Sequence, residues 1–318
     1  MTITQLSTFV LVARLGSVGA AARALDVSES AVSQTLTALR VHFGDPLIRR
    51  TGGGGMRLTP AGARLLPVAS RMAALSADAE AAVRAARGAP DELRVVATST
   101  LAEFVLPSLM EAFARRSGPR TETSFGVAAD GGIRVLVENR LADVALGPYL
   151  GDDGRGDLVS EPLFRTHLVV VTGAGSPRPP GPPARWSWLV DSSGTDPDAD
   201  SGRLLRRLGV TEGNVWVFPN QTATLAAAAE GAGVAPAPAH LVSPRVRRDE
   251  LRLLETPATP ADATWHVTVL RPGHRSPATD AFLHFLHTPA ATRIMRAPGA
   301  GVPPSRFRPP VHVTLWDA

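Results

Sequence analysis

The sequence predicts a small helical domain, a long connecting helix and a larger α/β region, in that order. Helical periodicity and capping signals predict three short helices, followed by a wing, within residues 1–59. An alanine-rich segment with helical periodicity spans residues 60–89, and strand and helix patterns alternate over residues 90–290. Residues 291–318 are rich in proline and glycine and are expected to form a tail. With 318 residues, the chain is long enough for about two domains.

Three short helices are predicted to open the chain. Apolar side chains recur at helical spacing over residues 4–15, and Gly16 follows as a typical helix end. Ser17 then caps a second helix of small residues, which another helix can approach closely. After a tight turn, Ser28 caps a third helix, and Glu29 suits its positive start. Helices in this order, with this turn, predict a helix-turn-helix motif.

A β-wing is predicted after the third helix. Two brief extended segments lie on either side of a glycine run at residues 52–55, and they carry Arg49, Arg50 and Arg57. A basic wing suits contacts to phosphates or to the minor groove of DNA. A solvated basic loop is the alternative interpretation.

A single long helix is predicted after the wing. Thr59 is a good N-cap, Pro60 suits the first helical position, and the pattern runs to about residue 87. At the usual rise per residue this helix is about 42 Å long. Its apolar residues lie three and four apart: Leu65, Val68, Met72, Leu75, Ala79, Ala82 and Ala86. This seam predicts a partner helix, most simply from a second copy of the chain, and a connector packed on its own domain is the alternative.

From residue 93 the pattern alternates between strands and helices. Strands at residues 93–97, 121–127 and 143–147 enclose helices near 101–116 and 130–140. This βαβαβ order predicts a parallel sheet. A second set follows, with strands at 167–172, 187–191, 214–218, 234–238 and 265–270 and helices at 202–208, 221–230 and 277–287.

The charged residues are unusual in type and in placement. The 33 Lys and Arg residues include no lysine, and there is no cysteine. Disulfides, thiolate zinc sites, cysteine nucleophiles, a phosphate-loop lysine and a lysine Schiff base are therefore excluded. Residues 1–90 hold ten arginines against five acids, a net charge of +5, whereas the remainder holds 23 against 24, or −1. This asymmetry predicts that the N-terminal part meets a polyanion.

Several kinds of site leave no trace in the sequence. It contains no hydrolase nucleophile elbow, metalloprotease motif or nucleotide-binding glycine fingerprint, so an enzyme has no positive support. The histidines show no zinc-type helical pair, and no metal or other cofactor is expected. No apolar run approaches the roughly 18 residues that span a bilayer, and the N-terminus lacks the features of a signal peptide. We therefore expect a cytoplasmic protein without a membrane partner.

The first 66 residues resemble the DNA-binding domain of LysR-type transcriptional regulators. The residues that carry the resemblance are Phe9, Gly16, Ser17, Ala20, Ala21, Ala22, Leu25, Ser28, Ala31, Val32, Ser33, Leu36, Leu39, Gly44, Pro46, Leu47, Arg50, Leu58, Thr59, Pro60, Ala61 and Gly62. The remainder is similar to the effector domain of that family in the order of its elements. It also shares the patches at residues 231–238 and 274–286, so the resemblance covers about residues 1–290.

The resemblance implies that the helix at residues 30–43 lies in the major groove of double-stranded DNA. The side chains that it places at the DNA are Ser17, Ser28, Glu29, Ser30, Ser33, Gln34, Arg49, Arg50 and Arg57. Glu29 stands where the family commonly has glutamine, and Gln34 where a basic residue is frequent, so the target sequence does not follow from the resemblance. An acid at a helix start, with no base contact, is the alternative role for Glu29.

The resemblance also implies that the α/β region is an effector domain of two lobes, similar to the periplasmic binding proteins. The residues implied to line the cleft between the lobes are Thr98, Ser99, Thr100, Gly147, Thr195, Asn220 and Thr222. Hydroxyls and free N–H groups at helix starts suit anions, which favours a small carboxylate as the effector. Ordinary helix capping is the alternative role for these residues.

Together, these expectations describe a regulator of transcription. Such a protein would bind a pseudo-palindromic operator as a homodimer or homotetramer, associating through its linker helix, with RNA polymerase as a further partner. A small-molecule effector in the cleft would change its assembly or the bend of the DNA. A DNA-bound protein that acts by occupancy alone is the nearer alternative. The other is a ligand-binding or catalytic protein whose helix-turn-helix serves only in protein contacts.

Overall fold

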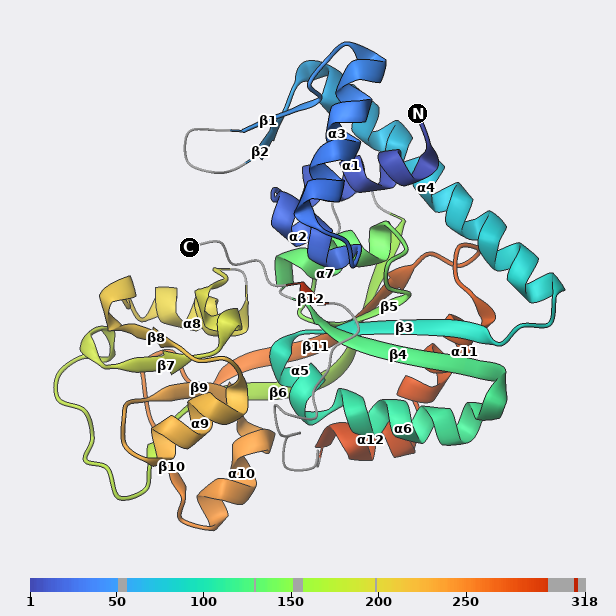
Figure 1. The fold of residues 1–318 in the computed structure, drawn as a ribbon. Helices are drawn as coiled ribbons and strands as arrows, with labels where there is room; N and C mark the ends of the chain where they lie inside the picture. The colour runs from blue at the N-terminus through green and yellow to red at the C-terminus, as the bar shows by residue number, and fades with distance from the viewer. Residues whose placement is uncertain (51–55, 129, 151–156, 198, 297–311, 314–318) are drawn as a thin grey trace.

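The computed structural model describes residues 1–50, 56–128, 130–150, 157–197, 199–296 and 312–313. The chain forms a helical domain, the long helix α4 and an α/β domain of two lobes (Figure 1). The glycine run 52–55 and most of the expected tail, residues 297–311 and 314–318, lie outside the described residues.

The helical domain is built as the capping signals predict. Its helices are α1 (Ile3–Leu15), α2 (Val18–Ala24) and α3 (Glu29–Phe43). Gly16 ends α1 in the left-handed conformation with φ 68°, and Asp26 turns the chain between α2 and α3 with φ 53°. The hydroxyls of Ser17 and Ser28 each accept a hydrogen bond from the N–H group three residues further on. The helix-turn-helix prediction is therefore confirmed.

The wing is a short antiparallel hairpin, as expected. Its strands are β1 (Ile48–Arg50) and β2 (Met56–Leu58), and Arg49 lies directly opposite Arg57. Like charges at directly opposed positions repel each other, so this pair favours an anionic partner over an empty solvent face.

A small polar cluster fixes the wing to the start of the long helix. The Thr59 hydroxyl donates to Asp45 Oδ1 at 2.7 Å and accepts from the N–H of Gly62 at 3.0 Å. The bonds that Asp45 receives from Thr59 and from the N–H of Leu47 lower the pKa of this carboxyl. A Cβ on Gly62 would lie 2.0 Å from the carbonyl oxygen of Leu47, so this close approach requires glycine.

The long helix α4 (Pro60–Ala86) uses the predicted seam in two different ways. Leu65 and Met72 are partly buried against the core of the helical domain. Val68 and Leu75 face outward, with 42% and 67% of their surface exposed. One face of this helix carries six exposed apolar residues, which we call the linker stripe: Val68, Leu75, Ala79, Ala82, Val83 and Ala86. The seam therefore packs on the helical domain at Leu65 and Met72, and the linker stripe remains exposed within the described part of the chain.

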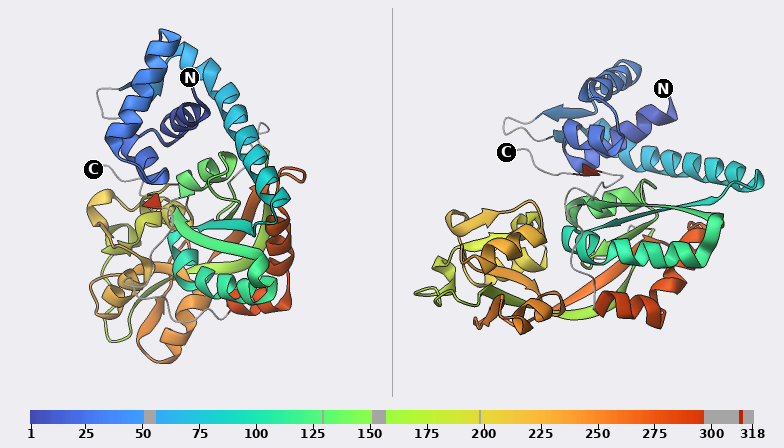
Figure 2. Two further views of the ribbon diagram at one scale, coloured as in Figure 1. Left: turned by 45° about the vertical axis from the view of Figure 1, so that its right-hand side comes forward. Right: turned by 60° about the horizontal axis from the view of Figure 1, so that its bottom comes forward.

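The α/β domain contains one large mixed sheet, in which the parallel order predicted for residues 93–97, 121–127 and 143–147 is confirmed. Its strands are β3 (Asp91–Ala97), β4 (Thr121–Ala128), β5 (Val144–Gly147), β6 (Leu158–Gly173), β9 (Ala235–Pro238), β10 (Leu251–Leu254), β11 (Ala261–Leu270) and β12 (His312–Val313). Strand β3 runs parallel to β4 and β5, and β12 runs parallel to β4. In contrast, β11 is antiparallel to β5 and β6, and β9 and β10 are antiparallel to β6. The long strands β6 and β11 carry the chain from one lobe to the other and back, so they run in opposite directions (Figure 2).

The first lobe packs helices on both faces of β3, β4 and β5. These helices are α5 (Ser99–Phe104), α6 (Leu106–Ser117), α7 (Asp130–Glu138), α11 (Pro277–Leu286) and α12 (Pro289–Arg296). The single helix expected near residues 101–116 is broken at Val105, because Pro107 cannot donate to the preceding turn and fits only at a helix start. Residues 291–296 are helical rather than part of the tail, since Ala291 and Met295 of α12 are buried in the core of this lobe.

The second lobe surrounds the ends of β6 and β11 that lie farther from the helical domain. It contains β7 (Trp188–Val190), β8 (Val215–Val217), α8 (Asp200–Arg207), α9 (Gln221–Ala229) and α10 (Ala239–Arg247). Short 3-10 turns occupy Gly118–Arg120, Pro183–Arg185, Ser192–Thr195 and Glu212–Asn214 in the domain. Strand β10 and helix α10 were not predicted. The sequence of α10 contains an internal proline, Pro244, and arginines that interrupt the apolar helical pattern.

None of the helices in these ranges has the length and apolar character that crossing a membrane requires.

Candidate functional site

The outer face of α3 is a row of exposed small side chains. The exposed residues that follow helical spacing along it are Ser30, Ser33, Gln34, Thr37, Ala38 and Val41. Val41 is 78% exposed, which is unusual for a large apolar side chain. Hydroxyl and amide groups can bond to base edges, and small apolar groups can contact a thymine methyl. The first three of these residues were predicted at the DNA, whereas Thr37, Ala38 and Val41, which continue the same helical spacing, were not.

Three other predicted DNA-binding residues, Ser17, Ser28 and Glu29, make contacts within the helical domain. Ser17 and Ser28 are used as N-caps, and Ser28 Oγ also lies 2.8 Å from Ser30 Oγ. The carboxylate of Glu29 turns back onto α2, where a Cβ on Gly19 would lie 2.8 Å from Glu29 Oε1. This placement favours the alternative role of Glu29 as an acid at the start of its helix.

The wing presents its three arginines to solvent. Arg49, Arg50 and Arg57 are all exposed. Because Arg49 and Arg57 are cross-strand partners and Arg50 is next along the strand, positive charge projects from both faces of the hairpin. The wing packs against α3 through shared apolar clusters, so these basic side chains and the polar face of α3 belong to one domain.

A cleft lies between the two lobes of the α/β domain. Its lining residues are Thr98, Thr100, Gly147, Pro148, Leu168, Ala199, Asp200, Ser201, Gln221, Pro236, Pro238, Ala263 and Trp265. About 560 Å³ of empty space lies among these residues, including space that is open to solvent.

Three of the predicted cleft residues line this space, and they do so at the ends of β3 and β5. Thr98 and Gly147 are neighbours, since a Cβ on Gly147 would lie 3.0 Å from Thr98 Cγ2. Thr100 follows in the first turn of α5. The lining residues that were not predicted, among them Asp200 and Trp265, come from segments that only the folded sheet brings together.

The other predicted cleft residues, Ser99, Thr195, Asn220 and Thr222, are not among the residues that line it. Asn220 caps α9, accepting from the N–H of Ala223 at 2.8 Å. Its neighbour Gln221 lines the cleft instead. Their proposed contact with an effector stays a prediction, and for Asn220 the capping role is the one that the geometry supports.

The start of α9 already holds a carboxylate from within the chain. Both oxygens of Glu103, on α5 in the first lobe, lie 3.2 Å from the N–H of Thr222 in the second lobe. Burial raises the pKa of Glu103, and the hydrogen bonds from Thr222 oppose this shift. This helix start was expected to bind an anionic ligand, but Glu103 occupies it and joins the two lobes.

A histidine packs behind the cleft wall. The ring of His240 lies 5.0 Å from that of Trp265 and 5.1 Å from that of Phe164, and its Nδ1 is 2.8 Å from Thr166 Oγ1. Burial lowers the pKa of His240 to about 4, so the imidazole is neutral at neutral pH.

Acidification is expected to destabilise the α/β domain through His240. Its pKa is about 6.5 in the unfolded chain and about 4 in the folded one, so the unfolded state binds the proton more readily. Above pH 6.5, the pKa of His240 in the unfolded chain, this destabilisation is absent. As the pH falls from 6.5 towards 4, the free energy of unfolding decreases by about 3 kcal/mol in all. Urea unfolding at pH 7 and about pH 4.5 should show a smaller loss for His240→Gln than for the wild type. Equal losses in the two proteins would contradict this placement of His240.

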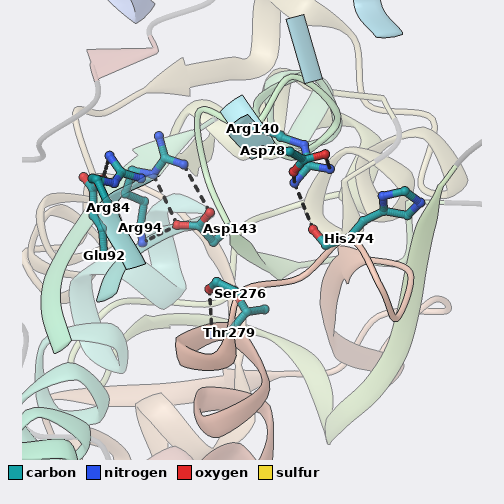
Figure 3. A network of polar contacts seen from close by, with 9 residues as sticks. All are labelled: Asp78, Arg84, Glu92, Arg94, Arg140, Asp143, His274, Ser276 and Thr279. Atoms are coloured by element: carbon teal, nitrogen blue, oxygen red, sulfur yellow. Dashed lines mark hydrogen bonds and ion pairs between the residues drawn. The ribbon is translucent and has the colours of Figure 1, made fainter. Parts of the chain in front are cut away.

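Polar contacts connect the linker helix to the first lobe (Figure 3). Arg140, which follows α7, pairs with Asp78 of α4 at 2.8 Å and donates to the carbonyl oxygen of His274 at 2.9 Å. Within the first lobe itself, the Asp143 carboxylate accepts hydrogen bonds from the backbone N–H of Arg94 at 2.8 Å and from its guanidinium at 3.1 and 3.2 Å.

A second set of contacts connects the helical domain to α7. Arg14 of α1 pairs with Glu138 of α7, and Glu138 also pairs with Arg134 at 3.4 Å. Arg134 in turn donates to the carbonyl oxygen of Leu150, two residues beyond the cleft residue Pro148. Val135 of α7 is buried with Leu11 of α1 in one apolar cluster.

Known proteins match this chain over both of its domains. Residues 3–63 match the model of the bacterial regulatory helix-turn-helix protein, lysR family, and residues 86–290 match that of the LysR substrate binding domain. An uncharacterised HTH-type transcriptional regulator of Mycobacterium tuberculosis is 32% identical over the full length of both chains. A solved full-length OxyR variant of Pseudomonas aeruginosa is similar over 90% of this chain and 97% of its own, with 18% identity and a TM-score of 0.56. Full-length LysG of Corynebacterium glutamicum, solved with bound effector arginine, is similar over 96% of this chain and all of its own, with 21% identity and a TM-score of 0.51.

The family models cover both the helix-turn-helix and most of the α/β domain, and the full-length relative is itself named a transcriptional regulator. The low-identity structures agree in fold. The chain therefore belongs to the LysR-type family of DNA-binding transcriptional regulators, and it is not an enzyme.

Proposed function

We propose that the protein binds a pseudo-palindromic DNA operator through α3 and the wing, and that a small molecule in the inter-lobe cleft controls this binding. The observation that carries the proposal is the exposed polar face of α3 beside a wing with three exposed arginines. Side chains of this kind reach base edges from a helix in the major groove, while arginines on the wing hold the phosphates or the minor groove.

The linker stripe supports self-association. Its apolar residues form one face of α4 that nothing within the described chain covers, and a second copy can cover it with the same face. We propose a homodimer through this helix or a homotetramer built from such dimers, acting in the cytoplasm with RNA polymerase as a further partner.

The cleft supports a small-molecule effector, and LysG was solved with an effector in place. The sequence favoured a small carboxylate as the effector. However, at the start of α9, one of the sites expected to bind it, the N–H of Thr222 already donates to the carboxylate of Glu103. Regulation by DNA occupancy alone remains the second candidate. Thermal unfolding with candidate metabolites separates the two, because a ligand that binds the folded state raises Tm.

Fluorescence anisotropy tests the DNA-binding proposal. The purified full-length protein is titrated with fragments of the DNA upstream of its own gene and with shuffled fragments, at several salt concentrations. Preference for one fragment that persists as salt rises supports a sequence-reading regulator. Absence of binding to every fragment would contradict the proposal. Equal affinity for all fragments would show that the α3 side chains do not recognise bases.

Removing one wing arginine is expected to weaken binding without changing sequence preference. Arg50→Ala should lower affinity for every fragment by a similar factor and reduce the slope of log affinity against log salt by about one, because one phosphate contact is lost. Arg116→Ala removes the same charge from an exposed position on α6 and is the matched control. Loss of affinity for one sequence only would contradict a phosphate contact by Arg50.

A further inference from the structure

We propose that the effector carries a protonated amine or a similar organic cation, which binds at Asp200 and Trp265 in the inter-lobe cleft. This inference rests on the proposed function of the cleft as the effector site.

The charge of the cleft lining points to a cation. Among the lining residues that the structure describes, Asp200 is the one ionisable side chain, and none is an arginine or a histidine. A carboxylate ligand would therefore meet a carboxylate without a basic partner in the lining. A cation would instead gain an opposite charge in a partly enclosed site, where Coulomb interactions are stronger than in bulk water.

Asp200 is placed to exchange its present partner for a ligand. It is the first residue of α8 and pairs with Arg203, whose side chain is 49% exposed whereas that of Asp200 is 26% exposed. An ion pair with so exposed a partner contributes little stability, so a ligand cation can compete with it. Burial raises the pKa of Asp200, while Arg203 and the nearby ring of His266 oppose this shift. A bound cation would add to that opposing effect.

An aromatic ring completes the site. Trp265 lines the cleft and is 6% exposed, and its position is set by ring contacts with Phe164 at 5.3 Å and His240 at 5.0 Å. The face of a tryptophan attracts cations, and more strongly where water is excluded.

Neutral polar groups supply acceptors for an ammonium group. The hydroxyls of Thr98, Thr100 and Ser201 belong to the lining. The Gln221 side chain donates through Nε2 to the carbonyl oxygen of Pro236 at 3.1 Å, which leaves Oε1 as its acceptor. The lining thus combines one negative charge, one large aromatic ring and several acceptors.

Matched small molecules test the ligand class on the full-length protein. Putrescine, succinate and butanediol form one set, and phenethylamine, phenylacetate and phenylethanol form another, so that within each set the number of carbon atoms is kept and the polar group and its charge change. Binding is measured by calorimetry and by the rise in Tm. We expect at least one amine to bind, and to bind at least about tenfold more tightly than its acid and alcohol counterparts. Failure of both amines to bind, or tighter binding of the acids, would overturn the proposal.

Substitution locates the binding amine. Asp200→Asn keeps the shape and the hydrogen bond to Arg203 but removes the charge, and it should weaken amine binding by at least about tenfold. Asp280→Asn removes a carboxylate outside the cleft and should leave amine binding unchanged. Unchanged amine affinity in Asp200→Asn would contradict the site. If an acid binds instead, and changing Thr100 abolishes that binding, the cleft remains the effector site and only the proposed ligand class fails.

Discussion

Leu75→Glu is expected to convert the protein into a monomer and to lower its affinity for a two-half-site operator about hundredfold. Leu75 is 67% exposed at the middle of the linker stripe, so in a symmetric dimer it meets the same stripe of the partner. A glutamate there places two negative charges in an apolar seam. A monomer loses the second half-site, which otherwise binds at high effective concentration. Sedimentation against the chain mass of 33.3 kDa and anisotropy on the operator measure the two effects.

Leu253→Glu is the matched control for this change. Leu253, on β10, is 54% exposed and lies in the second lobe, away from the linker helix. The same chemical change at this position should leave the mass in solution and the operator affinity close to the wild-type values. A Leu75→Glu protein that remains dimeric would contradict the role of the linker stripe. A monomer with full operator affinity would separate dimerisation from DNA binding.

Asp143→Ala is expected to lower the free energy of unfolding of the α/β domain by about 3 kcal/mol. The Asp143 carboxylate receives three hydrogen bonds from Arg94. The side chain of Asp143 is 19% exposed and that of Arg94 is 30% exposed. Removal of the carboxylate leaves a partly buried guanidinium and one backbone N–H without their acceptor. Urea unfolding, followed by tryptophan fluorescence, measures the loss.

A neighbouring ion pair serves as the control for Asp143. Arg84 and Glu92 lie 3.5 Å apart with side chains 52% and 41% exposed. Solvent screens such a pair, so Arg84→Ala should change the free energy of unfolding by less than about 0.5 kcal/mol. Similar losses for Asp143→Ala and Arg84→Ala would show that burial does not distinguish the two pairs.

The helical domain could be predicted closely because its signals are local. Gly16 and Ser28 end and begin helices through groups within a few residues of themselves. The family resemblance implied a place for Ser33 and Gln34 on the DNA-facing side of α3, whereas helical spacing, which is also local, could have extended that face to Val41 and was not used. The direction of a strand is different. Strands β6 and β11 carry ordinary strand patterns, and only their course between the lobes makes them antiparallel.

The cleft could be predicted only in part, because it is assembled from distant segments. Thr98 and Gly147 follow strand ends that meet at one edge of the sheet, a rule that sequence can use. Asp200 and Trp265 reach the cleft through the register of β6 with β11 and through the packing of α8. At the start of α9, the sequence located the helix correctly. In the folded chain Glu103 bonds to the N–H of Thr222, and Gln221, rather than Asn220 or Thr222, lines the cleft.

Helix α7 borders both functional regions of the chain. A Cβ on Gly147 in the cleft would lie 3.2 Å from Ile133 of this helix, and two residues later Val135 is buried beside Leu11 of the helical domain. A ligand in the cleft that moved α7 would therefore also change its contact with the helical domain. Such coupling is reciprocal, so operator DNA must change the affinity for that ligand by the same factor by which the ligand changes the affinity for DNA. A chain saturated with its operator would thus respond to a different concentration of the same small molecule than the free protein does.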